Sequence, residues 1–383
     1  MPTTVPTDLL EIRHHLHANP EVSGDEFKTA AFIKTFFDAL QPDYLEEGVG
    51  GSGVVAAVGP ASQSNSILFR AELDALPIQE INQFDHKSII EGVSHKCGHD
   101  GHMTILLGLA QRLKKYASAR LKGYFLFQPA EETGEGAKGV IMDSRFKALT
   151  PKYAFALHNL PAFPLGSVVI KKGTFTAAVK SMIIKLEGKT SHAAEPENGI
   201  NPGLAIAEII SLCGGLSNPV SEADDFNVIT LIAVKLGELA YGVSAGYGEV
   251  HLTMRAWTKQ SMDQLIEELS QHLTEIAKKH QLNLSIEWTN EFEANENDDY
   301  AVEIVRQAAQ NLNLEVIEMD YPLRWGEDFG AITQQCAGAM FGLGAGIDSP
   351  ALHNPDYDFP DALLPIGQSL FEEIFKLTET QIN

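Results

Sequence analysis

Hydrophobic and polar positions in the first part of the chain follow two alternating patterns. Residues 7–40 and 103–116 carry apolar side chains at helical spacing, and Asn19-Pro20 interrupts the first of these stretches. Short, nearly continuous apolar runs predict strands at residues 53–58, 67–71, 123–127 and 153–157. Strands that alternate with helices are typical of βα units, so we expect a largely parallel sheet.

The pattern changes near residue 176. From there it predicts strand, helix, strand, strand, helix and strand, at residues 179–187, 201–216, 227–236, 248–257, 261–280 and 282–289. This βαββαβ order is typical of a ferredoxin-like sandwich. A helix over 298–312 and strands over 314–318 and 340–346 then return to the first pattern. We therefore expect an α/β fold: a discontinuous α/β domain with a mostly parallel sheet, residues 1–177 and 292–383, and an inserted ferredoxin-like α+β domain, residues 178–291.

Length and charge narrow the class of protein. A chain of 383 residues is long enough for two domains. The formal net charge of −23 argues against nucleic acids and anionic membranes as partners, because their phosphates would be repelled. We see no signal peptide and no apolar run of about 18 residues, so no membrane span is expected. Cys97, Cys213 and Cys336 are too few and too scattered for a disulfide framework, and we expect a cytoplasmic location.

Residues with metal-binding chemistry occur in several separate places. The stretch HKCGHDGHM, residues 95–103, holds three histidines, one cysteine and one aspartate directly before a predicted helix. Other polar side chains follow predicted strands: Asp74 after LFRAEL, Glu131 and Glu132 in QPAEE, and His158 at the end of YAFALH. The carboxyl ends of strands in an open α/β sheet meet at one edge, where sites form. We therefore expect these side chains to gather there.

Together these residues form a ligand set for a divalent transition metal. Cys97 as thiolate, His99 and His158 as neutral imidazoles and Glu132 as carboxylate would supply sulfur, nitrogen and oxygen. The neighbouring Glu131 could carry protons to and from a water at the metal. Each residue taken alone has an ordinary explanation, since a glutamate pair is usually solvated and a lone histidine usually structural. The shared location favours the metal site.

Two other kinds of functional site, a dinucleotide-binding turn and a serine-hydrolase elbow, are not expected in this chain. GVGGSG, residues 48–53, matches the dinucleotide-binding pattern in letters, but a strand follows it instead of a helix, so we expect a plain turn. A serine hydrolase needs a G-x-S-x-G elbow between a strand and a helix, and we expect none in this chain.

The ordered set of motifs resembles the amidohydrolase branch of the M20 metallopeptidase family, which includes N-acyl-amino-acid, hippurate and auxin-conjugate hydrolases. The resemblance runs from LHANPE (16–21) nearly to the end of the chain, through CGHDGH, QPAEE, ALH, GKTSHAAEPENGINP, GEDFG and ALHNPDYDFPD. It implies a catalytic α/β domain with an inserted lid domain. It also implies two divalent metal ions held by Cys97, His99, Glu132, His158 and His353, with Cys97 bridging and Glu131 as general base.

The resemblance extends to residues of the inserted domain. His192 in SHAAEP matches a histidine that approaches the substrate carbonyl, and Arg255 in LTMRAW matches an arginine that meets a substrate carboxylate. From the residues alone, either side chain could instead be a solvent-facing one. Family members usually carry an asparagine in an NVIP-like turn, whereas this chain has Gly242 in AYGVSAG. In the catalytic domain, Asp74 is expected to orient a ligand rather than bind metal.

These expectations define a function. The chain is expected to be a metal-dependent amidohydrolase that cleaves the amide bond of small N-acyl amino acids. The alternatives are a dipeptidase or carboxypeptidase with the same metal core, or a binding protein without activity on this scaffold. His95 and His102 are expected to be structural or to support the ligands. The sequence leaves open whether the metals are zinc, manganese, cobalt or nickel, and whether the chain forms a homodimer through the lid, as some relatives do.

Overall fold

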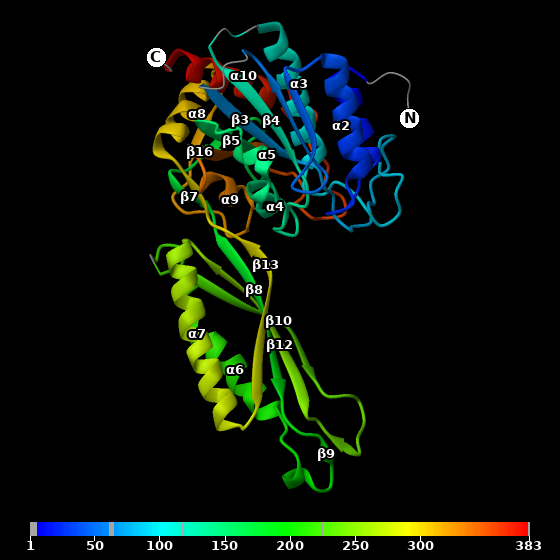
Figure 1. Ribbon diagram of the computed structural model, residues 1–383, viewed down its shortest axis with the longest axis vertical. Helices are drawn as coiled ribbons and strands as arrows, with labels where there is room; N and C mark the ends of the chain where they lie inside the picture. The colour runs from blue at the N-terminus through cyan, green and yellow to red at the C-terminus, as the bar shows by residue number, and fades with distance from the viewer. Residues whose placement is uncertain (1–5, 61–64, 117, 119, 224, 382–383) are drawn as a thin grey trace. The chain divides into compact units, whose positions relative to one another are not determined.

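The computed structural model describes residues 6–60, 65–116, 118, 120–223 and 225–381 (Figure 1). It forms two compact units: unit 1 comprises Met1–Phe175, Asn295–Asp320 and Glu327–Asn383, and unit 2 comprises Thr176–Ala294 and Tyr321–Gly326. The ends of the predicted first domain, residues 1–5 and 382–383, lie outside the described residues. The short segment 321–326, which the sequence pattern left outside the inserted domain, packs within unit 2. Its Arg324 donates a hydrogen bond to Ser221 Oγ at 2.5 Å.

Unit 1 is built on an eight-stranded sheet in the order β1-β2-β4-β3-β5-β16-β6-β15. The strands are β1 (Tyr44–Val49), β2 (Gly53–Val58), β3 (Ser66–Glu72), β4 (Lys122–Gln128), β5 (Tyr153–Pro161), β6 (Val168–Ile170), β15 (Val316–Glu318) and β16 (Gly338–Gly346). The neighbouring strands β4, β3, β5 and β16 run parallel, whereas β1 pairs antiparallel with β2, β2 with β4 and β6 with β16. The described residues of β2, β3 and β4 are buried throughout, which agrees with their apolar runs.

The helices of unit 1 cover this sheet. They are α1 (Leu9–Ala18), α2 (Phe27–Leu40), α3 (His99–Tyr116), α4 (Gly136–Met142), α5 (Ser144–Lys147), α8 (Asp299–Asn311), α9 (Phe329–Thr333) and α10 (Leu363–Gln381). One hydrophobic core joins the sheet to apolar side chains of α1, α2, α3, α8 and α10. Asp8 caps α1 by accepting hydrogen bonds from Leu10 N and Glu11 N, and Asp298 caps α8 in the same way.

Unit 2 has the predicted order of elements. Strands β8 (Ala178–Glu187), β10 (Asn227–Leu236), β12 (Tyr247–Ala256) and β13 (Asn283–Phe292) form an antiparallel sheet in the order β10-β12-β8-β13. Helices α6 (Gly203–Leu216) and α7 (Lys259–Lys279) pack on one face of it and share its core (Figure 1). The minor strands β9 (Ser191–His192) and β11 (Val243–Ser244) pair with each other, as do β7 (Gly173–Thr176) and β14 (Asn295–Asn297).

The predicted fold class is confirmed, with two local corrections. Helix α3 begins at His99 rather than at residue 103, so part of the histidine-rich stretch is already helical. Strand β5 continues past His158 to Pro161, because its pairing with β16 persists beyond the histidine. No described helix is both long and apolar enough to cross a membrane.

Candidate metal centre

Four segments of unit 1 bring potential ligands to the carboxyl edge of its parallel strands. Cys97 lies two residues before His99, the first residue of α3, while His158 lies on β5. Glu131 and Glu132 follow β4, and the segment after β16 carries His353. The structure thus brings together all the residues of unit 1 that the sequence predicted as ligands or base.

The ligand atoms form overlapping groups. In each group the atoms lie within 4.8 Å of one another: Cys97 with His99 and His158, Cys97 with Glu132 and His353, and His99 with Glu131 and Glu132. Cys97 Sγ is 3.5 Å from His158 Nε2, and His353 Nε2 is 3.7 Å from Glu132 Oε2. Cys97, His99 and Glu132 each belong to two of these groups, an overlap that suits a pair of neighbouring cations.

Backbone carbonyl groups orient two of the histidines. His99 Nδ1 donates to the carbonyl oxygen of Asp74 at 2.8 Å, and His158 Nδ1 donates to that of Asn159 at 2.9 Å. These bonds leave the Nε2 lone pair of each ring directed at the site, because a neutral imidazole with a protonated Nδ1 accepts at Nε2. Sequence patterns cannot reveal such bonds, since they depend on how loops from different strands meet.

Asp74 forms hydrogen bonds next to the proposed ligands. Its Oδ2 accepts hydrogen bonds from Glu132 N at 3.0 Å and from Ser23 Oγ at 2.7 Å, and its side chain is fully buried. Burial raises the pKa of this carboxyl group, but the contacts with His99, Glu132 N and Ser23 outweigh that effect and lower it. The contacts agree with an orienting role.

Glu131 and Glu132 differ in their surroundings although they are adjacent. Glu131 lies with the buried carboxylates of Glu327 and Asp328, and burial together with these charges raises its pKa well above the usual range. Burial also raises the pKa of Glu132, to about 7, although His99 opposes the shift. Carboxylates crowded in this way repel one another in their charged forms. A cation at the centre would relieve that repulsion.

His353 is held in an uncommon backbone conformation. Its φ is +65°, in the left-handed region, and its backbone N donates to the carbonyl of Lys96 at 2.9 Å. Ala130, in the turn before the glutamate pair, also has a positive φ, of 49°. Residues with side chains adopt this region at a cost that surrounding structure must offset, and such residues cluster at functional sites.

The donor set fits a divalent transition metal. It offers one thiolate, three imidazoles and a carboxylate, the chemistry that zinc and its neighbours in the periodic table prefer. His99 Nε2 and Glu132 Oε1 are buried and have no hydrogen-bond partner among the described residues. Buried polar atoms are nearly always satisfied, so these two atoms point to a ligand at the centre of the site.

The predicted site residues of the inserted domain belong to unit 2. His192 is exposed on β9, and its Nδ1 accepts a hydrogen bond from Ala194 N at 3.1 Å. This bond leaves the proton on Nε2, so the ring presents a donor to its surroundings. Arg255, half-buried on β12, forms no ion pair with any described carboxylate, and burial lowers its pKa.

A serine nucleophile is not supported by the structure. The letters GVSAG, residues 242–246, do match G-x-S-x-G, which corrects the expectation drawn from the sequence. However, Ser244 lies on the short strand β11, is followed by strand β12 and accepts a hydrogen bond from Asn201 Nδ2 at 3.1 Å. A nucleophile elbow instead joins a strand to a helix.

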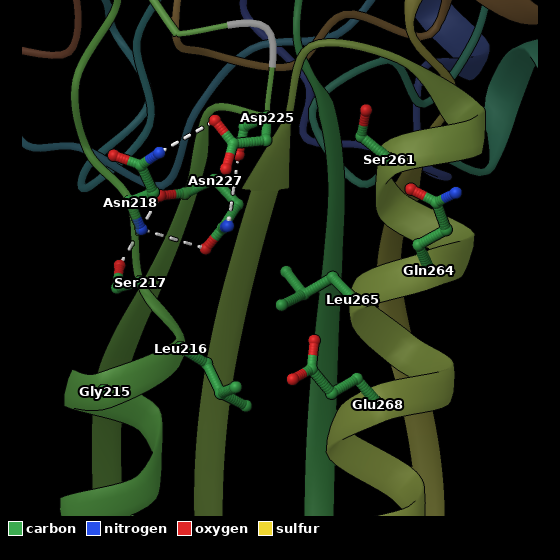
Figure 2. Close-up of a pocket in the computed structure, with 10 residues that line it drawn as sticks. All are labelled: Gly215, Leu216, Ser217, Asn218, Asp225, Asn227, Ser261, Gln264, Leu265 and Glu268. Atoms are coloured by element: carbon green, nitrogen blue, oxygen red, sulfur yellow. Dashed lines mark hydrogen bonds between the residues drawn. The ribbon is translucent and has the colours of Figure 1, made fainter.

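Unit 2 also contains a polar pocket of about 390 Å³ between the end of α6, the start of β10 and the first turns of α7 (Figure 2). Asn218 Nδ2 donates to Asp225 Oδ1 at 2.9 Å, and Asn218 N donates to the side chain of Asn227 (Figure 2). These groups satisfy one another, and none of the predicted site residues lines the pocket. It is therefore not the candidate site.

Sequence reasoning missed a buried network around the ligands. His102 Nδ1 donates to Glu72 Oε2 at 2.8 Å, and its Nε2 lies 2.5 Å from Asn159 Oδ1, so its expected structural role agrees with its contacts. Arg70 pairs with Glu72, Glu327 and Asp328. The GEDFG motif, residues 326–330, was the sequence signal that could have indicated Glu327 and Asp328. His95 is buried, its ring nitrogens have no hydrogen-bond partner among the described residues, and burial lowers its pKa to about 3.

Comparisons with known proteins identify the family. Residues 68–377 match the model of peptidase family M20/M25/M40. This chain belongs to the M20 family. An N-acetyl-L-cysteine deacetylase of Bacillus subtilis is 31% identical over 99% of this chain and 90% of its own length. An N-acetyldiaminopimelate deacetylase of Priestia megaterium is 28% identical over 96% of this chain and 98% of its own length.

Solved structures agree with this assignment. A crystal structure of a Bacillus subtilis protein, described as a dinuclear metal binding peptidase from the M20 family, matches with a TM-score of 0.83 and 25% identity. The match covers 98% of each chain. The predicted family and enzyme class are confirmed: the chain is an M20 metal-dependent hydrolase of amide bonds.

Proposed function

We propose that this M20 enzyme uses two divalent metal ions to remove the acyl group from small N-acyl amino acids. The observation that carries the proposal is the set of overlapping ligand groups, in which Cys97, His99 and Glu132 each belong to more than one group. The relatives named as N-acetylcysteine and N-acetyldiaminopimelate deacetylases support the substrate class. The ligands proposed are Cys97, His99, Glu132, His158 and His353.

Bound divalent cations would supply Lewis-acid polarisation of the amide carbonyl and activation of a water molecule. The chain's own contribution to proton transfer would come from Glu131. Its carboxylate would accept the proton of the attacking water and return it to the departing amine. Glu131 suits this role because it is buried beside the ligands but faces Glu327 and Asp328, whereas Glu132 faces Cys97 and His353.

His192 and Arg255 complete the proposal from unit 2. The Nε2 proton of His192 would stabilise the negative charge that develops on the carbonyl oxygen. Arg255 would bind the carboxylate of the amino acid, and its lack of an ion pair with the described residues supports this assignment. These roles come from the resemblance to the family, and the tautomer of His192 agrees with them.

A substrate panel tests the proposal. Metal-reconstituted protein should hydrolyse N-acetyl, N-benzoyl or indole-acetyl amino acids more efficiently than dipeptides, when kcat/KM is measured for each. The Glu131→Gln variant is the control, because contaminating hydrolases would be unaffected by it. A preference for dipeptides would favour the dipeptidase alternative. Absence of turnover with both panels, at full metal loading, would favour a binding protein and overturn the proposal.

We also propose that the chain forms a homodimer through unit 2. Strand β10 is an edge strand of its sheet, and its apolar side chains are exposed: Leu231, Ile232, Val234 and Leu236. An open, apolar edge with one charged residue, Lys235, is suited to antiparallel pairing with a second copy of itself. Leu204 and Ile210 add exposed apolar surface on the neighbouring helix α6. A cytoplasmic location is proposed as well, supported by the three free cysteines.

A further inference from the structure

Lys96 is a fully buried lysine next to a proposed metal ligand. Its Nζ donates to Glu80 Oε1 at 2.5 Å and to the carbonyl oxygen of Tyr357 at 2.7 Å. Burying an ammonium group is costly unless it is both paired and hydrogen-bonded. A side chain retained at such a cost, one position before Cys97, calls for an explanation beyond packing.

The backbone of Lys96 binds the segment that carries another ligand. Its carbonyl oxygen accepts the hydrogen bond from His353 N at 2.9 Å, while its ammonium group holds the carbonyl of Tyr357. The segment 353–357 is therefore attached to this one residue at both of its ends. Cys97 follows Lys96 in the chain, and His353 is hydrogen-bonded to the Lys96 carbonyl group. Both residues share a ligand group with Glu132.

The partners of Lys96 extend to a third ligand and to the rest of unit 1. The hydroxyl group of Tyr357 accepts a hydrogen bond from Asn159 Nδ2 at 2.5 Å, and Asn159 directly follows His158 on β5. Glu80 Oε1 also lies 3.0 Å from His17 Nε2 on α1, and Glu80 Oε2 accepts from Ser88 N at 2.6 Å. The ammonium group thus joins segments that are far apart in the sequence.

We propose that Lys96 is a positioning residue of the metal centre: its ammonium group, clamped between Glu80 and Tyr357, sets the separation of Cys97 and His353. The inference rests on the proposed metal site. Groups that orient metal ligands without touching the metal typically contribute about 10–100-fold to metal affinity. A lysine that served folding alone would instead affect stability and leave metal affinity unchanged.

Cobalt titration distinguishes these roles. Co²⁺ is added to metal-free protein, and binding is followed by the absorption band of the thiolate–cobalt bond, which reports on Cys97. We expect Lys96→Met to weaken Co²⁺ binding by about 10–100-fold and to reduce or shift that band. Lys122→Met is the matched control, because Lys122 is another buried lysine of unit 1, and its Nζ lies over the ring of Tyr124 on the same strand, β4. Its affinity and band should equal those of the wild type.

A second variant, Glu80→Gln, keeps the role of Lys96 testable if Lys96→Met does not fold. Glu80→Gln keeps the size of the side chain but removes its charge and one of its two acceptor oxygens, and we expect weaker Co²⁺ binding in this variant too. If Lys96→Met does not fold, Glu80→Gln decides the question alone. Wild-type affinity and an unchanged band in the folded variants would overturn the role of Lys96. Absence of Co²⁺ binding by the wild type would instead overturn the proposed function.

Discussion

At the scale of single residues, two adjacent glutamates have different surroundings. Glu132 Oε2 lies 3.7 Å from His353 Nε2, whereas Glu131 shares a buried group with Glu327 and Asp328. Ala130, directly before the pair, adopts a positive φ. A proton carrier must be close to the metal ligands without being one of them, and Glu131 meets that requirement.

Glu131→Gln should retain the metal but lose turnover. An amide cannot accept the proton of the attacking water, so we expect kcat to fall by roughly 10²–10⁴-fold. Metal content, measured by elemental analysis after gel filtration, should match the wild type. Glu132→Gln is the control and should lose metal as well as activity. Wild-type kcat in Glu131→Gln would remove this residue from its proposed role.

Gly242→Asn tests the departure from the family pattern. Gly242 O accepts a hydrogen bond from Ala193 N at 3.0 Å, and the next residue, Val243, pairs with His192. A Cβ atom at Gly242 would meet no other atom within 4 Å, so the variant should fold normally. An added amide donor beside His192 should raise kcat/KM by about fivefold, the value of one hydrogen bond. Gly242→Ala is the control, and equal kcat/KM in the two variants would contradict the expectation.

At the scale of helices and strands, the sequence was most informative where apolar runs were long. Strand β2 begins and ends at the predicted residues, and the six main elements of unit 2 occur in the predicted order. Apolar periodicity specifies these elements because burial determines them. Helix α3 was predicted four residues late, since its first turn carries the polar residues His99, Asp100 and His102 in place of an apolar stripe.

The candidate site was predictable only in part. Asp74, Glu131 and His158 were found because strand ends of a parallel sheet share an edge. His353 follows no such rule, and only the resemblance to the family identified it. Lys96 and Glu80 carried no signal, because their pairing joins two loops whose contact depends on the whole of unit 1.

Ile232→Lys tests the dimer at the level of strand β10. Ile232 lies at an irregularity in the pairing of β10 with β12 and is 60% exposed. A dimer that pairs β10 with its copy would place two such lysines in an apolar interface, and edge lysines oppose strand pairing. We expect a wild-type dimer and a monomeric variant by size-exclusion chromatography with light scattering. Ile81→Lys is matched in exposure, at 58%, but lies in unit 1, and should stay dimeric. A monomeric wild type would refute the dimer.

At the scale of the whole molecule, a buried charge network joins the two ends of the chain within unit 1. Arg13 on α1 pairs with Asp100 at the start of α3, and with Asp358 and Asp361 just before α10. His17 Nδ1 lies 2.8 Å from Asp100 Oδ2, and its Nε2 lies 3.0 Å from Glu80 Oε1. An imidazole between two carboxylates donates at both nitrogens, so it carries a positive charge.

The charge on His17 makes stability depend on pH. Burial lowers its pKa, but Asp100 and Glu80 outweigh this effect and raise it to about 9 from an ordinary value of 6.5. A group with a raised pKa contributes stability that is fully present below pH 6.5 and is lost as the pH rises through 9. The contribution is roughly 3 kcal/mol at most. The other charged or titratable groups around the ring are Arg13, His86, His95 and Asp358.

His17→Gln should therefore lose more stability in acid than in alkali. Urea unfolding at several values between pH 6 and 9.5 should show a large deficit of the variant at pH 6, and the deficit should shrink as the pH rises. His15→Gln is the control on the same helix. Burial lowers the pKa of His15 from 6.5, so any pH dependence of its contribution lies below that value, and the stability difference should stay nearly constant from about pH 7 to 9.5. A deficit of His17→Gln that stays constant over this range would mean that His17 contributes by packing and neutral hydrogen bonds, and that the network carries no imidazolium.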